Sequence, residues 1–264
     1  VENYPGYSEG VLGPKMMEDF KKQAERFGTK IFQEVVNSVD FTKRPFTVTT
    51  EKQTLQTKSI IISTGASAKR LGLENEKKLY GKGVSACATC DGFFFKGKTV
   101  VVVGGGDTAM EEANFLTRFA SKVYLVHRRD EFRASKIMLE RAKKNPKIEF
   151  VMNTQVVDIL GVEAGHVTGV QLRNLVTGQL SNLACDGFFA AIGHEPNTKI
   201  FVGKLELDKK GYIVTKSEST ATSVEGVFAG GDCVDHRYRQ AVTAAGMGCS
   251  AAIDAERWIE SQEV

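Results

Sequence analysis

Apolar residues recur with helical spacing close to the start of the chain. Pro14 follows Gly13 at one end of this segment, and Gly28 follows its other end. Between them the spacing i, i+3, i+7, i+10 is kept by Met17, Phe20, Ala24 and Phe27. Proline suits the first turn of a helix, and glycine suits the residue after its last turn. The pattern predicts an amphipathic helix over residues 14–27.

After this helix the apolar residues are β-branched or aromatic and come in short runs separated by turn residues. The runs cover residues 31–32, 35–41, 46–50 and 59–63, and the last run ends at Thr64-Gly65-Ala66. Short runs of this composition are typical of strands rather than helices. This part of the chain is therefore predicted to be a set of strands.

A regular alternation of strand and helix patterns begins near residue 99. Strand patterns at 100–103 and 123–126 are each followed by a helix pattern, at 108–119 and 134–145. Such a βαβα unit implies a parallel sheet with helical crossovers and an α/β fold. A charged stretch at 69–82 suggests a domain boundary near its start. Further strands are predicted at 148–151, 156–160, 167–172, 188–192 and 227–229. We also expect a turn at 193–196 and an alanine-rich helix that ends near Trp258.

Composition and charge exclude several classes of protein. The chain has 264 residues, of which 42% are hydrophobic and 25% charged, as in folded globular proteins and unlike disordered chains. No apolar run approaches the ~20 residues that a bilayer requires, so we expect no membrane-spanning helix. The net charge of +3 is too small for a nucleic-acid binder that depends on a broad basic field.

The cysteines indicate a reducing compartment. There are five of them, an odd number, and only Cys87 and Cys90 are close in sequence, which argues against a secreted disulfide framework. We expect a cytoplasmic protein, or one from an organelle such as a plastid.

The N-terminal Val1 is neither an initiator Met nor the start of a signal peptide, and we interpret it as a cut end.

A glycine-rich turn joins the strand at 100–103 to the helix that follows. Its sequence is Gly104-Gly105-Gly106-Asp107-Thr108-Ala109. This fits G-x-G-x-x-A between a strand and a helix, the fingerprint of a dinucleotide site. The first glycine permits the tight turn, the second lets the backbone approach a pyrophosphate, and Ala109 lets the helix pack close to the strand. The alternative is a turn with a capping box between Thr108 and Glu111 and no ligand.

Basic residues follow the next strand, where a dinucleotide-binding domain selects its cofactor. An acidic residue at this place would bind the ribose hydroxyls of NAD. This chain instead has His127-Arg128-Arg129, with Arg133 one turn later. Guanidinium groups here suit a 2′-phosphate, so NADPH is the expected cofactor. The alternative is a solvated basic face.

A C-x-x-C motif lies just before the βαβ unit. The residues are Cys87-Ala88-Thr89-Cys90-Asp91-Gly92. In a reducing compartment this pattern indicates a redox-active dithiol. Zinc is the main competitor, but a structural zinc site needs four ligands and no second pair is present, so we expect no metal. Asp91 can exchange a proton with a thiolate, and its alternative role is that of a turn residue beside Gly92.

A second acidic candidate follows the strand at 227–229. Asp232 comes after Gly230 and Gly231, and alanine and glycine then recur through residues 239–259. A carboxylate behind two glycines can bind polyol hydroxyls, and its alternative role is a helix N-cap. Cys185 and Cys249 are expected to be small core residues.

Taken together, these motifs resemble the low-molecular-weight, bacterial and plant type of NADPH-dependent thioredoxin reductase. The matching segments run in order along the whole chain. They are Val1-Glu2-Asn3-Tyr4-Pro5-Gly6, the C-x-x-C motif, the glycine turn, His127-Arg128-Arg129, Ala191-Ile192-Gly193-His194-Glu195-Pro196-Asn197 and Arg239-Gln240-Ala241. The resemblance implies a two-domain pyridine nucleotide-disulfide oxidoreductase architecture. A Rossmann-like NADPH domain at 69–194 is inserted into a Rossmann-like FAD domain at 1–68 and 195–264.

The resemblance also implies a path for electrons. They pass from NADPH to FAD, then to the Cys87–Cys90 disulfide, and by thiol exchange to thioredoxin, with Asp91 as proton donor and acceptor. Links near residues 68 and 194 act as hinges in the family, which is dimeric. The residues implied around FAD are Asn3, Thr64, Gly65, Asp232, Arg239, Gln240 and Ala241.

The chain departs from the family at its start. Family members begin with a strand, a G-x-G-x-x-G turn and a helix that hold the FAD pyrophosphate, and this sequence has none of them. We therefore expect an incomplete FAD domain, weak FAD binding, no thioredoxin reduction by this chain alone, and a strand at 59–63 without sheet neighbours. The alternative function is a non-catalytic NADPH-binding protein, and the flavin content of the purified chain distinguishes the two.

Overall fold

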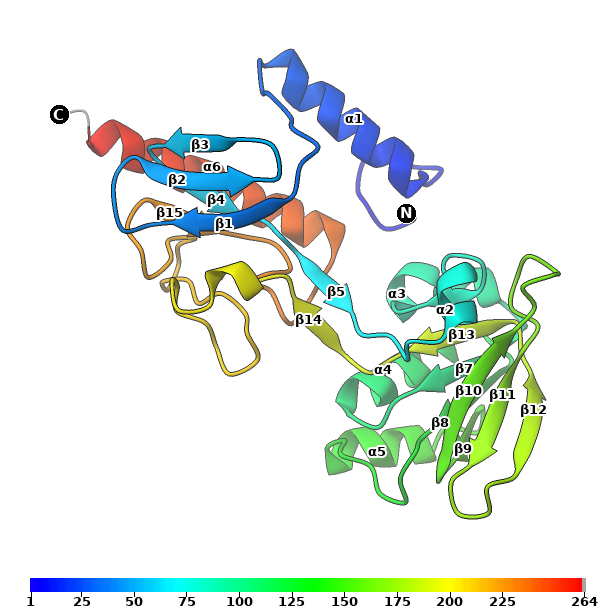
Figure 1. The fold of residues 1–264 in the computed structure, drawn as a ribbon. Coiled ribbons are helices and arrows are strands. Elements are labelled where there is room, and N and C mark those ends of the chain that lie inside the picture. Colours follow the sequence, from blue (N-terminus) through cyan, green and yellow to red (C-terminus); the bar gives the residue numbers. More distant parts are fainter. Residues whose placement is uncertain (263–264) are drawn as a thin grey trace. The chain divides into compact units, whose positions relative to one another are not determined.

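The computed structural model describes residues 1–262, which form two compact units (Figure 1). One unit is continuous in sequence, Ala68–His194. The other is built from two segments, Val1–Ser67 and Glu195–Val264. The continuous unit is therefore an insertion, and its ends lie beside the boundaries expected at residues 68 and 195.

The inserted unit is built on a five-stranded parallel sheet. Its strand order is β6-β13-β7-β8-β9, and each neighbouring pair is parallel. The strands are β6 (Val84–Ser85), β7 (Thr99–Val103), β8 (Lys122–Val126), β9 (Ile148–Val151) and β13 (Gly187–Ala190). Val100, Val101 and Val102 of β7 are fully buried, because a central parallel strand is covered on both faces. The predicted α/β fold with a parallel sheet is confirmed.

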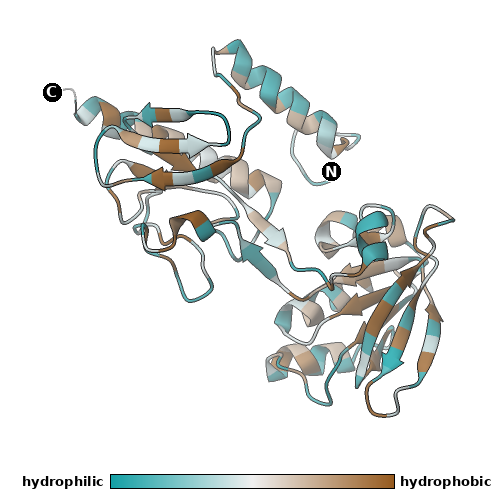
Figure 2. Ribbon diagram, in the orientation of Figure 1, coloured by the Kyte–Doolittle hydropathy of each residue, from teal (hydrophilic) through white to brown (hydrophobic). Residues whose placement is uncertain are grey.

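Helices cover one face of this sheet, and a second sheet covers the other. Val100 and Val102 pack in one cluster with residues of α4 and α5, whereas Val101 packs with residues of an antiparallel three-stranded sheet. This division follows from the alternation of side chains along a strand. The elements are α4 (Asp107–Leu116), α5 (Lys136–Lys143), β10 (Thr154–Leu160), β11 (Gly169–Asn174) and β12 (Leu180–Ala184). Figure 2 shows hydrophobic residues concentrated in the strands of the parallel sheet.

Short helices precede the central strand β7. They are α2 (Glu74–Lys78), α3 (Ala88–Asp91) and the 3-10 helix η1 (Gly92–Phe95). The helix patterns at 108–119 and 134–145 predict α4 and α5 correctly, but both helices are shorter than the patterns. The strands β6 and β12 and the short helices α2, α3 and η1 were not predicted.

The two-segment unit combines two small sheets with a long C-terminal helix. β1, β2 and β3 form an antiparallel sheet, and β4 pairs in parallel with β15. Phe228 of β15 packs against Ala251 and Ala255 of α6, where small side chains allow close approach. The elements are α1 (Gly13–Arg26), β1 (Val36–Asp40), β2 (Phe46–Thr50), β3 (Thr54–Thr57), β4 (Ile60–Ile62), η2 (Lys199–Phe201), β15 (Val227–Ala229) and α6 (Ala241–Ser261). No helix in the described range 1–262 is long and apolar enough to cross a membrane.

Three expectations for this unit are wrong. Residues 31–35 form no strand, and Ile31 and Phe32 are exposed. The strand at 59–63 is not isolated, because β15 supplies a parallel neighbour. Finally, the expected turn at 193–196 contains the strand β14 (His194–Pro196), which pairs with β5 (Ala66–Ala68) where the chain passes between the units.

Candidate active site

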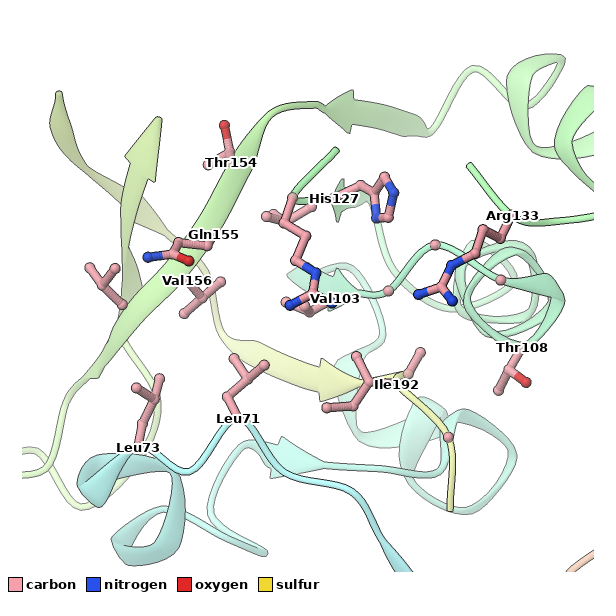
Figure 3. Close-up of a pocket in the computed structure, with 18 of the residues that line it drawn as sticks. Leu71, Leu73, Val103, Thr108, His127, Arg133, Thr154, Gln155, Val156 and Ile192 are labelled. Carbon is pink, nitrogen blue, oxygen red and sulfur yellow. The ribbon is translucent and has the colours of Figure 1, made fainter. Parts of the chain in front are cut away.

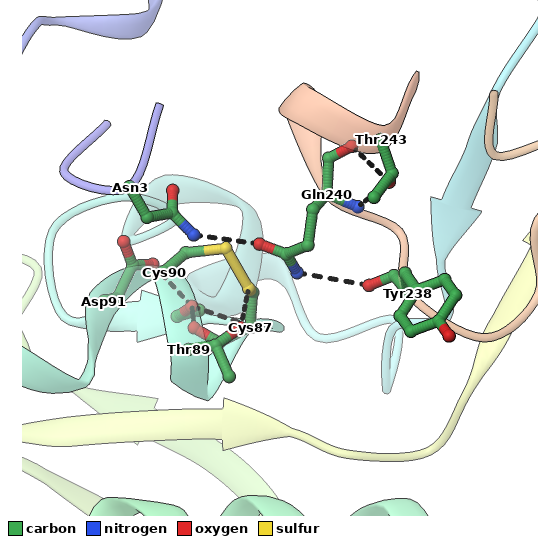
Figure 4. Close-up of a disulfide and its surroundings, with 9 residues drawn as sticks. Asn3, Cys87, Thr89, Cys90, Asp91, Tyr238, Gln240 and Thr243 are labelled. Carbon is green, nitrogen blue, oxygen red and sulfur yellow. Dashed lines mark hydrogen bonds between the residues drawn. A yellow bond between two sulfur atoms is a disulfide. The ribbon is translucent and has the colours of Figure 1, made fainter. Parts of the chain in front are cut away.

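The Cys87–Cys90 pair forms a disulfide (Figure 4). Cys87 is the residue before α3 and Cys90 lies within it, so a single helical turn brings the two sulfur atoms together. Both residues are half-buried, and the Thr89 hydroxyl lies 3.4 Å from Cys87 Sγ. Partial exposure leaves a disulfide accessible to thiol exchange. Within residues 1–262, no group of three or more His, Cys, Asp or Glu side chains is arranged to hold a metal ion.

A buried serine connects Asp91 to the redox cysteine. Ser85 Oγ donates a hydrogen bond to Asp91 Oδ2 at 2.6 Å and accepts one from the Cys87 backbone N–H at 3.1 Å. Ser85 is only 5% exposed, so this contact is shielded from water. Ser85 has no signal in the sequence, because a serine two residues before a cysteine matches no recognised pattern.

The remaining cysteines lie outside the disulfide. Cys185 and Cys233 are buried, and Cys249 is exposed. Burial raises the pKa of the Cys185 thiol to about 12 and also raises the pKa of Cys233. The expectation of a core position is confirmed for Cys185 and wrong for Cys249, which lies on a solvent-accessible part of α6.

The three glycines of the glycine-rich turn differ in their surroundings. A Cβ on Gly104 would lie 2.4 Å from the Ala191 carbonyl oxygen, and a Cβ on Gly105 would lie 2.1 Å from His127 Cε1. A Cβ on Gly106 would meet no atom within 4 Å, and its φ of −107° is open to any residue. The protein itself therefore does not require glycine at position 106. Close approach of a ligand would require it, which fits a dinucleotide pyrophosphate.

The capping-box alternative for this turn is wrong. Gly106 is the N-cap of α4, and no side-chain hydrogen bond caps this helix. The Asp107 carboxylate instead accepts a hydrogen bond from the Ser135 backbone N–H at 2.6 Å. Ala109 is fully buried under Gly104, as the fingerprint predicts.

A cavity of about 900 Å³ opens beside the glycine turn (Figure 3). The sequence-predicted residues that line it are Gly104, Gly106, Thr108, His127, Arg128 and Arg133. Asp107, Ala109 and Arg129 do not line it. Figure 3 shows Arg133 beside the glycine turn, with Gln155 and Val156 on the facing strand. Within residues 1–262, neither the Arg128 nor the Arg133 guanidinium group has a hydrogen-bond or ion-pair partner, which leaves both groups available to an anion.

Two strands contribute lining residues that the sequence analysis missed. Gln155 of β10 is the register partner of Arg173 of β11, and both side chains line the cavity. Leu71 and Leu73 line another edge. The backbone N–H groups of Leu71 and Gly72 donate to the carboxylate of Glu76, which is 1% exposed. A cavity made by distant segments has no local sequence signal.

Asp232, in the two-segment unit, carries an unsatisfied buried oxygen. Asp232 Oδ1 is buried and has no hydrogen-bond partner among residues 1–262. Burial raises the pKa of Asp232, and the nearby Asp235 raises it further. A buried acceptor without a donor is costly, and a polyol hydroxyl would supply the donor. The N-cap alternative is wrong, because Gln240 is the N-cap of α6.

The loop before α6 is organised by Asp235. Its carboxylate accepts backbone hydrogen bonds from Arg237, Tyr238 and Arg239 at 2.8–3.1 Å. Arg239 adopts φ +48°, a left-handed conformation that these hydrogen bonds hold in place. The loop presents Gln240, whose Oε1 accepts a hydrogen bond from Asn3 Nδ2 at 2.9 Å, and Ala241 then begins α6 (Figure 4).

Thr64 and Gly65 follow β4 in the same unit. Asn197 donates its side-chain amide to the Thr64 carbonyl at 3.0 Å and its backbone N–H to the Gly65 carbonyl at 2.9 Å. Gly65 has φ +70°, a conformation that favours glycine. The structure thus brings Asn3 together with Gln240, and Asn197 together with Thr64 and Gly65.

Comparison with known proteins identifies the family. Residues 3–248 match the model of the pyridine nucleotide-disulphide oxidoreductase family. The chain is 56% identical to thioredoxin reductase 2 of Arabidopsis thaliana, with 98% of this chain and 70% of that protein covered. It is 54% identical to thioredoxin reductase of Mycolicibacterium smegmatis, with 100% and 84% covered.

A solved structure agrees with these relatives. Thioredoxin reductase from Giardia duodenalis superposes with a TM-score of 0.90 at 45% identity, covering 98% of this chain and 85% of that one. The matched residues 3–248 extend over both units and span Cys87, Cys90, the glycine turn and the loop before α6. The chain therefore belongs to the pyridine nucleotide-disulphide oxidoreductase family and, within it, to the thioredoxin reductases.

Proposed function

We propose that this chain, when it carries FAD, passes electrons from NADPH through the flavin to its Cys87–Cys90 disulfide and then to thioredoxin. The observation that carries the proposal is a half-exposed disulfide in the same compact unit as a cavity that the glycine turn, Arg128 and Arg133 line. The relatives named thioredoxin reductase support thioredoxin as the substrate. The resemblance also favours a homodimer, and the three unpaired cysteines favour a reducing compartment such as the cytoplasm.

NADPH fits the cavity of the inserted unit. Gly106 allows the backbone at the start of α4 to approach the pyrophosphate, where the helix dipole favours an anion. Arg128 and Arg133 would hold the 2′-phosphate. These residues bind and orient the cofactor.

FAD fits the unit that contains Asp232. Asp232 Oδ1 would accept a hydrogen bond from a hydroxyl of the flavin polyol, and the loop of Arg239, Gln240 and Ala241 would lie along the cofactor with Asn3, Thr64 and Gly65. When bound, FAD supplies the means to convert a hydride into the two electrons that reduce a disulfide. The absorbance spectrum of the purified protein tests this assignment, because bound flavin absorbs visible light and NADPH alone does not.

The dithiol performs the exchange with thioredoxin. Reduction by two electrons breaks the Cys87–Cys90 bond and leaves two thiols after uptake of two protons. One thiolate then attacks the thioredoxin disulfide, forms a mixed disulfide and releases one substrate thiolate. The second cysteine attacks the mixed disulfide, which restores the Cys87–Cys90 bond and releases reduced thioredoxin. Asp91, whose carboxylate accepts a hydrogen bond from Ser85, would give and take the protons of these steps.

Thiol counting tests the disulfide directly. We expect three thiols in the oxidised, denatured protein, those of Cys185, Cys233 and Cys249, and all five after reduction. In the native oxidised protein Cys249 should react fastest, because it is exposed whereas burial raises the pKa of the other two. A chromogenic disulfide reagent measures both counts.

The control for this count is Cys249→Ser, which should lower each count by one without changing the difference made by reduction. Five thiols before and after mild oxidation would contradict the disulfide. Stoichiometric zinc in the purified protein would favour the metal site instead.

We expect Asp232→Asn to raise the melting temperature of the flavin-free protein by about 1–3 °C at neutral pH. Burial raises the pKa of Asp232, so its contribution to stability is full below the ordinary value of 3.8 and is lost as the pH rises through the folded value. The neutral amide avoids this loss. The difference should therefore disappear at pH about 3, as thermal melting across pH will measure.

Asp235→Asn is the matched control, with the opposite sign. Although burial raises its pKa, three backbone N–H donors lower the pKa of Asp235 overall. Its contribution to stability is present at neutral pH and is lost as the pH falls through the folded value, so Asp235→Asn should lower the melting temperature at neutral pH. A lower melting temperature for Asp232→Asn at neutral pH would mean that Asp232 has a donor within the protein.

A further inference from the structure

The side chain of His127 is packed against the backbone of the glycine turn. His127 follows β8 and is 6% exposed. A Cβ on Gly105 would lie 2.1 Å from His127 Cε1 and 2.4 Å from Nδ1, so the ring occupies the space next to the Gly105 backbone. The family fingerprint G-x-G-x-x-A leaves this position open. In this chain Gly105 is dictated by its histidine neighbour.

The same ring also fixes the path of the loop that bears the arginines, residues 128–133. His127 Nε2 lies 2.9 Å from the Glu131 carbonyl oxygen. A carbonyl can only accept, so Nε2 is the protonated nitrogen in this contact. The ring stacks on Phe132 with centroids 4.8 Å apart and an interplanar angle of 24°. One side chain therefore touches both the glycine turn and the far end of the arginine loop.

Two backbone contacts complete the connection between the turn and the loop. Arg133 N–H donates to the Gly105 carbonyl at 2.7 Å, and Ser135 N–H donates to Asp107 Oδ1 at 2.6 Å. The Arg128 and Arg133 guanidinium groups have no hydrogen-bond or ion-pair partner within residues 1–262. Their position at the cavity therefore depends on the backbone that bears them.

We propose that His127 is a positioning residue that sets the selectivity for the 2′-phosphate. It holds the arginine loop against the glycine turn. The backbone at the start of α4, which binds the pyrophosphate, and Arg128 and Arg133, which bind the 2′-phosphate, then keep a fixed spacing. The proposal rests on the proposed function, in which this cavity binds NADPH. His127 also lines the cavity, but its ring is only 6% exposed beside Gly105 and its Nε2 proton is engaged by the Glu131 carbonyl, so its role differs from the charge contacts of the arginines.

The test measures the affinities of 2′,5′-ADP and 5′-AMP, two probes that differ only in the 2′-phosphate, by calorimetry with the full chain. We expect His127→Ala to lower the ratio of the two affinities by about tenfold while 5′-AMP binding changes by no more than about threefold. His127→Phe keeps a ring over Phe132 but loses the hydrogen bond to Glu131, and should lower the ratio less. If His127 had only a structural role, its replacement would weaken the binding of both probes equally.

Glycine variants provide the matched controls. Gly105→Ala displaces the histidine ring and should lower the ratio of the two affinities as His127→Ala does. The double variant Gly105→Ala with His127→Ala should have a ratio no lower than that of the more affected single variant. The Cβ added in Gly106→Ala meets no protein atom within 4 Å. This variant should therefore weaken the binding of both probes by the same factor and leave the ratio of affinities unchanged.

The outcomes separate this inference from the proposed function. If the native protein does not prefer 2′,5′-ADP to 5′-AMP, the assignment of NADPH fails. If it does prefer 2′,5′-ADP and the ratio is unchanged in His127→Ala and His127→Phe, the positioning role fails. Should His127→Ala not fold, as judged by circular dichroism, the ratios of His127→Phe and Gly105→Ala decide.

Discussion

Replacing Arg128 and Arg133 together with alanine is expected to weaken NADPH binding by about 10²–10⁴-fold and NADH binding by no more than about threefold. Both guanidinium groups line the cavity and are free to meet an anion. The 2′-phosphate is the only group that NADPH has and NADH lacks, and each charge-assisted contact contributes about 1.5–3 kcal/mol. Calorimetric titration with both nucleotides measures the two losses.

The control for this pair is Arg141→Ala, which removes the same charge from an exposed position of α5 that does not line the cavity. It should affect NADPH binding by less than about twofold, because a distant exposed charge is screened by salt. Arg129→Ala tests whether the sequence motif or the position at the cavity decides NADPH binding, since Arg129 belongs to the motif but does not line the cavity. Equal losses for NADPH and NADH in the double variant would assign these arginines to a solvated basic face.

The sequence predicts the inserted unit well because its signals are local. The valines of β7, the glycine turn and the apolar spacing of α4 lie within about twenty consecutive residues, and a βαβ unit is built from such neighbours. The C-x-x-C spacing is equally local, since one turn of α3 brings Cys87 and Cys90 together. Patterns of this kind need no knowledge of distant contacts.

The features that the sequence misses depend on contacts between distant segments. Gln155 and Arg173 reach the cavity only because β10 and β11 pair in one register. The strand β14 forms because β5 offers it a partner, whereas its residues His194, Glu195 and Pro196 have turn-like composition. Strand pairing across long separations overrides local propensity, so these features follow from the fold and not from the pattern.

The structure also gives the glycine turn a more specific interpretation than its motif. The fingerprint treats Gly104 and Gly106 as the essential positions, but packing requires Gly104 and Gly105, and only Gly106 is free of protein neighbours. The fingerprint thus combines one glycine kept for the ligand with others kept for the fold. The surroundings of each glycine separate these roles, whereas the spacing alone does not.

Changing either Cys87 or Cys90 to serine is expected to lower NADPH-dependent reduction of thioredoxin by at least about 10³-fold in enzyme that carries FAD. A serine hydroxyl cannot form the disulfide that accepts the electrons, and the remaining thiol cannot resolve a mixed disulfide. NADPH affinity should change by less than about twofold, because neither cysteine lines the cavity. Steady-state reduction of thioredoxin and calorimetric titration measure the two quantities.

Cys249→Ser is the matched control, since it makes the same chemical change at an exposed cysteine outside the disulfide, and it should keep activity within about twofold of the native enzyme. The two active-site variants also identify the attacking sulfur. The variant that retains the attacking cysteine should accumulate a mixed disulfide with thioredoxin, because the resolving thiol is absent. The other variant should not. Retention of more than a tenth of native activity by both variants would mean that electrons reach thioredoxin without the Cys87–Cys90 pair.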